Sequence, residues 1–162
     1  MRRTTLAGMT AALLLIAGAI NGCATDHEPG TASPEAIQQG IAGFYAEAQQ
    51  VQQELAAIED GAARFARLAQ YKDRLRQRAA AYEQSVVDGR IDPLEQQVYD
   101  ELQGLLLTLN NIPDRPFSPD YCEIVRQSIY LAWAPGEPAP APEQFSRSVR
   151  EGLRFLDVLC AP

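Results

Sequence analysis

The sequence is poor in the residues that carry most enzyme chemistry. Its 162 residues include one histidine, one tryptophan and three cysteines. It contains no glycine-rich phosphate loop, no nucleophile elbow and no run of His, Cys, Asp or Glu with metal-ligand spacing. The one histidine, His27, stands in a polar stretch without companion ligands and is interpreted as a solvated linker residue. The sequence therefore predicts no catalytic activity, no cofactor and no metal site.

Long apolar runs are also missing after residue 20, and no stretch of useful length shows the alternation typical of strands. Positive charge is in deficit, with 14 Lys and Arg against 21 Asp and Glu, and this net charge of −7 argues against binding to nucleic acid. The hydrophobic fraction of 46% is too high for a disordered chain. We therefore expect an all-α globular domain without a membrane-spanning helix.

The first 22 residues have the organisation of a secretory signal. A positive start, Met1-Arg2-Arg3, precedes an apolar stretch over residues 6–20, which is shorter than the roughly 20 residues that a spanning helix needs. A small residue then stands directly before Cys23. Because residues 1–22 contain two arginines and no acidic residue, their removal takes the net charge from −7 to −9.

The tetrapeptide Ile20-Asn21-Gly22-Cys23 resembles the lipobox of bacterial lipoproteins, and the resemblance covers this segment only. It implies that Cys23 becomes the acylated N-terminus, whose palmitate-type chains anchor the protein in a membrane. For a Gram-negative source, Ala24 implies the periplasmic face of the outer membrane. The alternative is an ordinary secreted protein with Cys23 as a leftover thiol. Residues 23–33 form the lipidated cysteine and a flexible polar tether, and residues 34–162 form the helical domain.

The first part of this domain predicts two long helices. Ser33 can cap the first helix, and Gly89 is suited to end the second. Apolar residues recur in two seams at alternating spacings of four and three, interrupted only at Lys72. The first seam contains Ile37, Ile41, Phe44, Ala48, Val51, Leu55 and Ile58, and the second contains Phe65, Leu68, Leu75, Ala79, Tyr82 and Val86.

Charge favours one of two arrangements of these helices. Residues 24–61 contain seven acidic residues and no Lys or Arg, whereas residues 62–90 contain seven basic and three acidic residues. A turn at residues 59–61 would form a hairpin that buries the facing seams and pairs opposite charges. The open alternative is one continuous rod, which would leave the first seam in need of another chain. We favour the hairpin.

We expect the partner-binding surface on these two helices, where the seams and opposite charges favour self-association or docking of a partner helix. The basic run of the second helix is interpreted as a solvated or paired face, with contact to anionic headgroups or another envelope component as the alternative. The predicted partner-binding residues are Ile37, Ile41, Phe44, Val51, Arg64, Arg67, Arg74 and Arg78.

Three further helices are predicted. The third begins at Asp92-Pro93-Leu94-Glu95, which is close to a capping box, and its seam is the most apolar of the domain, so we expect it at the core. The fourth begins near Ser118 and the fifth follows a proline-rich spacer at residues 135–142. The seam of the fourth helix is Tyr121, Val125, Ile129 and Trp133, and that of the fifth includes Phe145, Val149, Leu153, Leu156 and Leu159.

Residues 88–95 resemble the second half of an EF-hand calcium loop. Gln84 and Val86, however, stand where the first half of such a loop needs acidic ligands. A helix that ends at Asp88-Gly89, followed by a capped helix, explains the same residues without a metal ion. We therefore predict two helix ends here.

Cys122 and Cys160 remain once Cys23 is assigned to lipid. In an exported domain such an even pair indicates a disulfide bond. The two cysteines fall at the start of the fourth helix and the end of the fifth, so antiparallel packing of these helices would bring them together. The absence of a C-x-x-C motif and of a nearby histidine argues against a redox-active or metal-binding pair.

Together these features predict a membrane-anchored periplasmic lipoprotein that acts as a non-catalytic interaction or scaffolding module of the cell envelope. Its expected partners are the membrane, through the lipid anchor, and an envelope protein or a second copy of itself. The alternative is a small-ligand-binding or inhibitor module with an apolar pocket between the helices. A third alternative is a cell-wall hydrolase that uses two carboxylates.

Overall fold

The computed structural model describes residues 33–136 and 141–161 and consists there of helices and their connections. The predicted signal segment, Cys23 and His27 lie outside the described residues. The prediction of an all-α fold with about five helices is confirmed. The elements are α1 (Pro34–Ala57), α2 (Gly61–Val87), α3 (Pro93–Asn110), α4 (Tyr121–Trp133), a short 3-10 turn η1 (Pro142–Gln144) and α5 (Arg147–Cys160).

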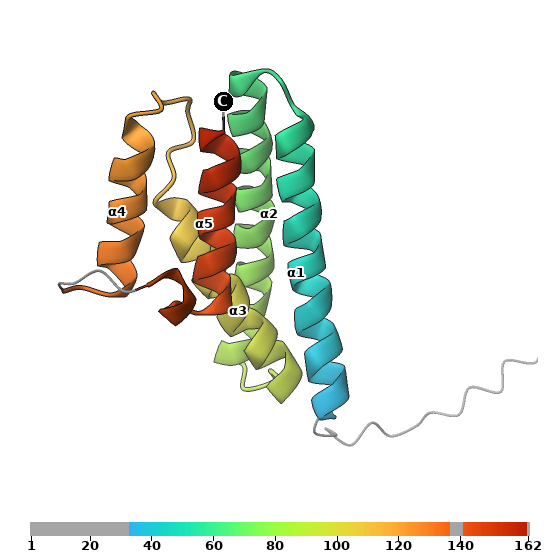
Figure 1. The fold of residues 1–162 in the computed structure, drawn as a ribbon. Helices are drawn as coiled ribbons and strands as arrows, with labels where there is room; N and C mark the ends of the chain where they lie inside the picture. The colour runs from blue at the N-terminus through green and yellow to red at the C-terminus, as the bar shows by residue number, and fades with distance from the viewer. Residues whose placement is uncertain (1–32, 137–140, 162) are drawn as a thin grey trace, which may run out of the picture.

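The five helices run alternately up and down (Figure 1). α1 and α2 lie side by side at one edge of the bundle, and α4 lies at the opposite edge with α5 between it and α2. The end of α5 lies near the turn between α1 and α2, whereas α1 begins at the other end of the bundle. α3 packs against α1, α2 and α5.

Helix starts are specified by local capping. The Ser33 side chain accepts a hydrogen bond from the backbone N–H of Ala36 at 3.3 Å. Asp92 and Glu95 form the predicted capping box, in which Asp92 Oδ1 accepts from the Glu95 N–H at 2.8 Å. These short-range contacts are why the sequence pattern located the starts of α1 and α3. α4 has no such side-chain cap and begins three residues later than expected, at Tyr121.

α1 and α2 form the hairpin, and the alternative of a continuous rod is wrong. α1 ends at Ala57, and the Asp60 side chain caps α2 by accepting from the Ala63 N–H at 2.6 Å. The opposite charges of the two helices pair as expected, with Arg67 on Glu54 and Arg78 on Glu47. Because such partly exposed pairs are worth about 0–1 kcal/mol each, burial of the seams supplies most of the stabilisation.

α3 lies at the core, as its seam predicts. Its residues Leu102, Leu105 and Leu109 are fully buried. Core side chains outside α3 come from every other α-helix and from the loop residues Ile112 and Phe145. The fully buried ones include Phe44, Tyr45, Leu55, Leu68, Tyr71, Leu75 and Phe155.

α3 and α5 approach each other closely at two glycines. A Cβ atom on Gly104 of α3 would lie 2.4 Å from Ser148 Oγ of α5, and one on Gly152 of α5 would lie 2.3 Å from Thr108 Cγ2 of α3. Each helix thus receives a side chain of the other at a position without a side chain of its own. The contact positions are 104 and 108 on α3 and 148 and 152 on α5, so the two contacts lie about one turn apart along each helix.

Lys72 stands at a seam position of α2 and is 1% exposed. Its ammonium group donates to the Ile112 carbonyl and to Asp114 Oδ1, both at 2.6 Å. Burial lowers the pKa of Lys72, and the hydrogen bond to Asp114 opposes that shift. The interruption of the second seam is therefore a buried anchor that ties the segment after α3 to α2 through two hydrogen bonds.

The two glycine contacts generate a stability prediction. We expect Gly152→Ala to lower the free energy of unfolding by about 1–3 kcal/mol, because the new methyl group must displace Thr108. Gly43→Ala is the matched control, since Gly43 lies on the exposed side of α1 with open space around it. Because alanine has a higher helix propensity than glycine, Gly43→Ala should raise the free energy of unfolding by up to about 1 kcal/mol. Urea unfolding followed by circular dichroism measures both, and equal stability of the two variants would contradict the close approach.

Candidate interaction surface

The predicted partner-binding surface on α1 and α2 is largely used inside the molecule. Phe44 and Val51 are each 2% exposed and belong to the core. Their assignment to a partner surface is therefore corrected. Ile37 and Ile41 are partly buried, and Ile41 packs against the same core. The first seam, which a continuous rod would have left without cover, is covered by α2, α3 and α5.

The four predicted arginines of α2 are also engaged within the chain. Arg67 and Arg78 pair with the acidic residues of α1 as described above. The Arg74 guanidinium lies 5.6 Å from the centroid of the Tyr71 ring. Arg64 donates to the Ile58 carbonyl and, at 3.4 Å, to the Ala161 carbonyl near the end of the chain. Arg64, Arg67 and Arg78 therefore tie α2 to neighbouring segments, and the Arg74 contact lies within α2.

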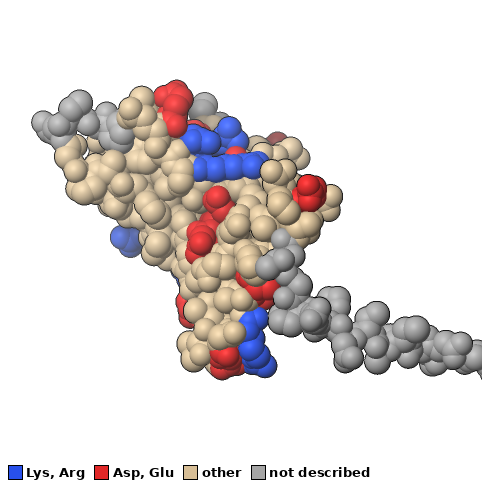
Figure 2. All heavy atoms as spheres, turned by 90° about the horizontal axis from the view of Figure 1, so that it is seen from below, with Lys and Arg blue, Asp and Glu red and all other residues tan. Residues whose placement is uncertain are grey.

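Charge on the molecular surface is mixed. Figure 2 shows the end of the bundle seen from below, where Lys and Arg side chains lie next to Asp and Glu side chains. The surface ion pairs of α2 and the turn after it include Arg76 with Asp73 and Arg90 with Asp88. Electrostatics alone therefore single out no binding face on this end.

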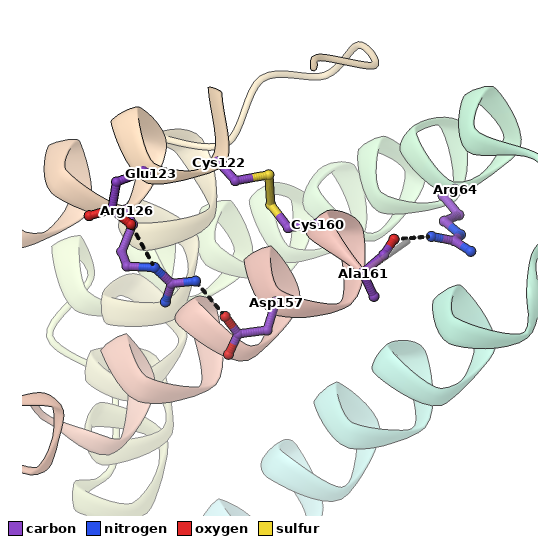
Figure 3. The surroundings of a disulfide bond; sticks show 7 residues. All are labelled: Arg64, Cys122, Glu123, Arg126, Asp157, Cys160 and Ala161. Atoms are coloured by element: carbon purple, nitrogen blue, oxygen red, sulfur yellow. Dashed lines mark hydrogen bonds and ion pairs between the residues drawn. A yellow bond between two sulfur atoms is a disulfide. The ribbon is translucent and has the colours of Figure 1, made fainter. Parts of the chain in front are cut away.

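α4 is fixed to the bundle at its first turn. The predicted disulfide is confirmed: Cys122 and Cys160 are bonded, with their Cα atoms 6.1 Å apart (Figure 3). One turn further along α4, Arg126 donates to Asp157 of α5 at 2.7 Å. This hydrogen bond raises the pKa of Arg126. A covalent and an ionic contact thus set the position of α4 on α5.

The second half of α4 is held by aromatic packing. The Tyr130 ring stacks on Phe145, which precedes α5, with 5.1 Å between the ring centroids. Val125 and Ile129 are the fully buried residues of this helix. α4 therefore buries one narrow side against α5 and leaves the opposite side open.

The open side of α4 is apolar. Ile124 is 55% exposed, Leu131 is 62% exposed and Tyr121, predicted as part of the buried seam, is 41% exposed. We call these three residues the outer face of α4. Sequence reasoning missed Ile124 and Leu131 because it searched for one seam per helix. Their spacing of seven residues, two turns of a helix, was the available signal.

The outer face continues into a surface hollow at the start of α4. This hollow has a volume of about 390 Å³ and is lined by Pro113, Arg115, Pro116, Phe117, Ser118 and Tyr121. Phe117 fixes the loop here, since its ring packs on Phe65 of α2 at 5.1 Å and on Tyr121 at 5.7 Å between centroids. The lining of the hollow is mixed, with Arg115 and Ser118 beside the apolar side chains, and Tyr121 is the residue that it shares with the outer face.

A second hollow, of about 370 Å³, lies where α3, α4 and the start of α5 meet. Leu107 and Trp133 supply its apolar lining, and the rest is polar, including Glu101 and Ser148. Beneath it the Tyr45 hydroxyl donates to Glu101, and the Arg147 guanidinium lies 3.9 Å from the centre of the Tyr45 ring. Burial and the carboxylate raise the pKa of Tyr45. These polar groups satisfy one another and tie α1 to α3 and α5.

Within residues 33–136 and 141–161, no group of three or more His, Cys, Asp or Glu side chains is placed to hold a metal ion. The residues that resemble half of a calcium loop have other roles. Asp88 caps the end of α2, Gly89 has a φ of 65°, and Asp92 and Glu95 cap α3. Among the helices described, none is both long enough and apolar enough to cross a bilayer.

No family model matches the chain, and no curated protein or solved structure matches it.

The disulfide yields a prediction about α4. Closing a loop across 38 residues should contribute about 4 kcal/mol to the free energy of unfolding. We expect Cys122→Ser combined with Cys160→Ser to lose that amount in urea unfolding. Dithiothreitol should lower the free energy of unfolding of the unmodified protein to that of the double variant. It should leave the free energy of unfolding of the double variant unchanged. A sensitivity of the double variant to dithiothreitol would contradict this assignment.

Proposed function

We propose that the chain is a membrane-anchored protein of the bacterial envelope that binds another protein through the outer face of α4 and has no catalytic role. The observation that carries the proposal is the exposure of Ile124 and Leu131 on a helix held by a disulfide. Burying one such side chain fully is worth about 1.5–3 kcal/mol. Burial of both side chains at the centre of a contact therefore supplies a substantial part of the free energy of binding.

The rigidity of α4 supports this role. A binding element that is already ordered does not pay a large entropic cost when a partner docks. Cys122, Arg126 and Tyr130 hold the helix along its length, so its outer face has the same geometry before and after binding. This is what a scaffolding or interaction module requires.

Anchoring is the second part of the proposal and rests on the lipobox-like residues ending at Cys23. α1 begins at Pro34, directly after its cap Ser33. About ten residues would therefore separate the acylated cysteine from the folded domain, a span of roughly 17 Å for a flexible coil. Such a tether keeps the domain next to the membrane and leaves α4 free to meet partners there.

The binding role is tested by photo-crosslinking in intact bacteria that produce the full chain. We expect a photoreactive amino acid at position 124 or 131 to give a discrete crosslinked product. The same amino acid at position 53, an exposed glutamine of α1, serves as the control and should give none. Absence of any product at 124 and 131 would rule out a binding role for the outer face.

The anchor is tested by replacing the acylated residue. Cys23→Ala should abolish palmitate labelling and release the protein from the membrane fraction, since the acyl chains supply the attachment. Thr25→Ala, two residues along the tether, should leave labelling and fractionation unchanged. Membrane retention of the Cys23→Ala protein would show that attachment does not depend on this cysteine.

A further inference from the structure

One end of the bundle exposes a pair of apolar side chains. Val87, the last residue of α2, is 81% exposed, more than any other large apolar side chain that the structure describes. Val86 is 40% exposed, and because it is the last residue of the second predicted seam, its exposure departs from that pattern. Ile91, two residues before α3, is partly exposed as well. The turn between α2 and α3 therefore has an apolar tip.

The same end holds the start of α1, to which the tether is joined (Figure 1). Gly40, in the second turn of α1, lies so close to α3 that a Cβ atom there would be 2.9 Å from Leu94 Cδ1. α3 begins at Pro93, directly after the apolar tip. The start of α1 and the tip are thus neighbours on one end of the bundle, which we call the near end and define as residues 34–37 and 86–95. The turn between α1 and α2 and the end of α5 lie at the opposite end.

The length of the tether favours the near end as the part of the domain that meets the membrane. About ten residues of flexible coil between Cys23 and α1 span roughly 17 Å. α1 has 24 residues and extends about 36 Å. Bringing the opposite end to the bilayer would therefore require the tether to extend well beyond its average span. The tether thus holds Val86 and Val87 near the lipid surface.

The charges of the near end indicate which lipid it fits. Its acidic residues outnumber its basic ones, with Glu35, Asp88, Asp92 and Glu95 against Arg90. Arg90 pairs with Asp88, and the other three acidic residues lie at the start of α1 or α3, where the positive end of the helix dipole favours them. A strongly anionic surface would repel this end, whereas zwitterionic headgroups would not. The charges therefore fit a zwitterionic lipid surface.

From these observations we propose that the near end docks on the zwitterionic lipid surface of the membrane that holds the anchor, with Val86 and Val87 inserted between the headgroups. The inference rests on the proposed anchoring and adds an orientation to it. Burial of the two valines away from water is favourable. Because the anchor already keeps the domain at the surface, this contact has only to select one orientation. The bundle then stands on the membrane, and the disulfide-held start of α4, at the opposite end, lies away from the lipid and open to partners.

The test is lipid photo-crosslinking of the acylated full chain in phosphatidylcholine vesicles. An amino acid that carries a diazirine replaces Val87, and mass spectrometry detects chains that gain the mass of one phospholipid. We expect this product, with the new bond on the glycerol or acyl region of the lipid. Ile124 and Glu59 are the control positions, because both are exposed and lie toward the opposite end. The same amino acid at either control position should give at least tenfold less lipid product.

Vesicle charge and flotation complete the test. The yield at position 87 should fall severalfold when phosphatidylglycerol makes the vesicles anionic, and an equal or higher yield would overturn the assignment of a zwitterionic surface. A chain that floats with the vesicles overturns the docking, and leaves the anchor intact, if position 87 gives no lipid product, a bond to the headgroup alone, or no more product than positions 124 and 59. A chain that does not float lacks the anchor, and that result would remove the anchoring proposal together with this inference.

Discussion

The close approach of α3 and α5 is the contact on which the rest of the structure depends. Gly104 and Gly152 allow each helix to receive a side chain of the other, Ser148 and Thr108 respectively. This interlocking fixes both the distance between the helices and their register along the axis, because a shift of one residue would place a side chain against a side chain. α1 and α2 then pack on α3, while α4 is carried by α5.

Polar contacts fix the position of segments that apolar packing alone does not hold in place. The buried ammonium of Lys72 holds Ile112 and Asp114, and this fixes where the chain leaves α3. A buried charge carries a desolvation cost, which the two short hydrogen bonds and a half-exposed carboxylate offset. With Phe117 packed on α2 and Cys122 bonded to α5, the segment between α3 and α4 is held along its length. The outer face of α4 is thereby presented in one orientation.

Much of this fold follows from local sequence signals, and what was missed is long-range. Ser33, Asp92 and the apolar seams act over three to seven residues, so helix starts and the α1–α2 hairpin were predictable. The Cys122–Cys160 bond spans 38 residues and was predictable because these two cysteines form an even pair once Cys23 is assigned to lipid. The role of Lys72 was not, because its acceptors lie about 40 residues away. The glycine contacts between α3 and α5 were hidden for the same reason. Phe44 and Val51 were assigned to a partner because a single seam does not reveal whether its cover comes from the same chain.

The division of apolar surface explains why α4 is the helix left for a partner. α1, α2, α3 and α5 enclose one another, so most of their seam residues are covered within the chain, whereas Val86 at the end of α2 is 40% exposed. α4 lies at the edge with α5 as its main neighbour, and a helix at an edge can bury only one side. Val125 and Ile129 occupy that side, which leaves Ile124 and Leu131 in water on the other. Scattered exposed apolar residues are ordinary, but Ile124 and Leu131 lie two turns apart on one side of α4, and with Tyr121 they form an exposed apolar area. A partner that covers this area would bury apolar surface that the edge position of α4 leaves exposed in the single chain. That burial would supply free energy of binding.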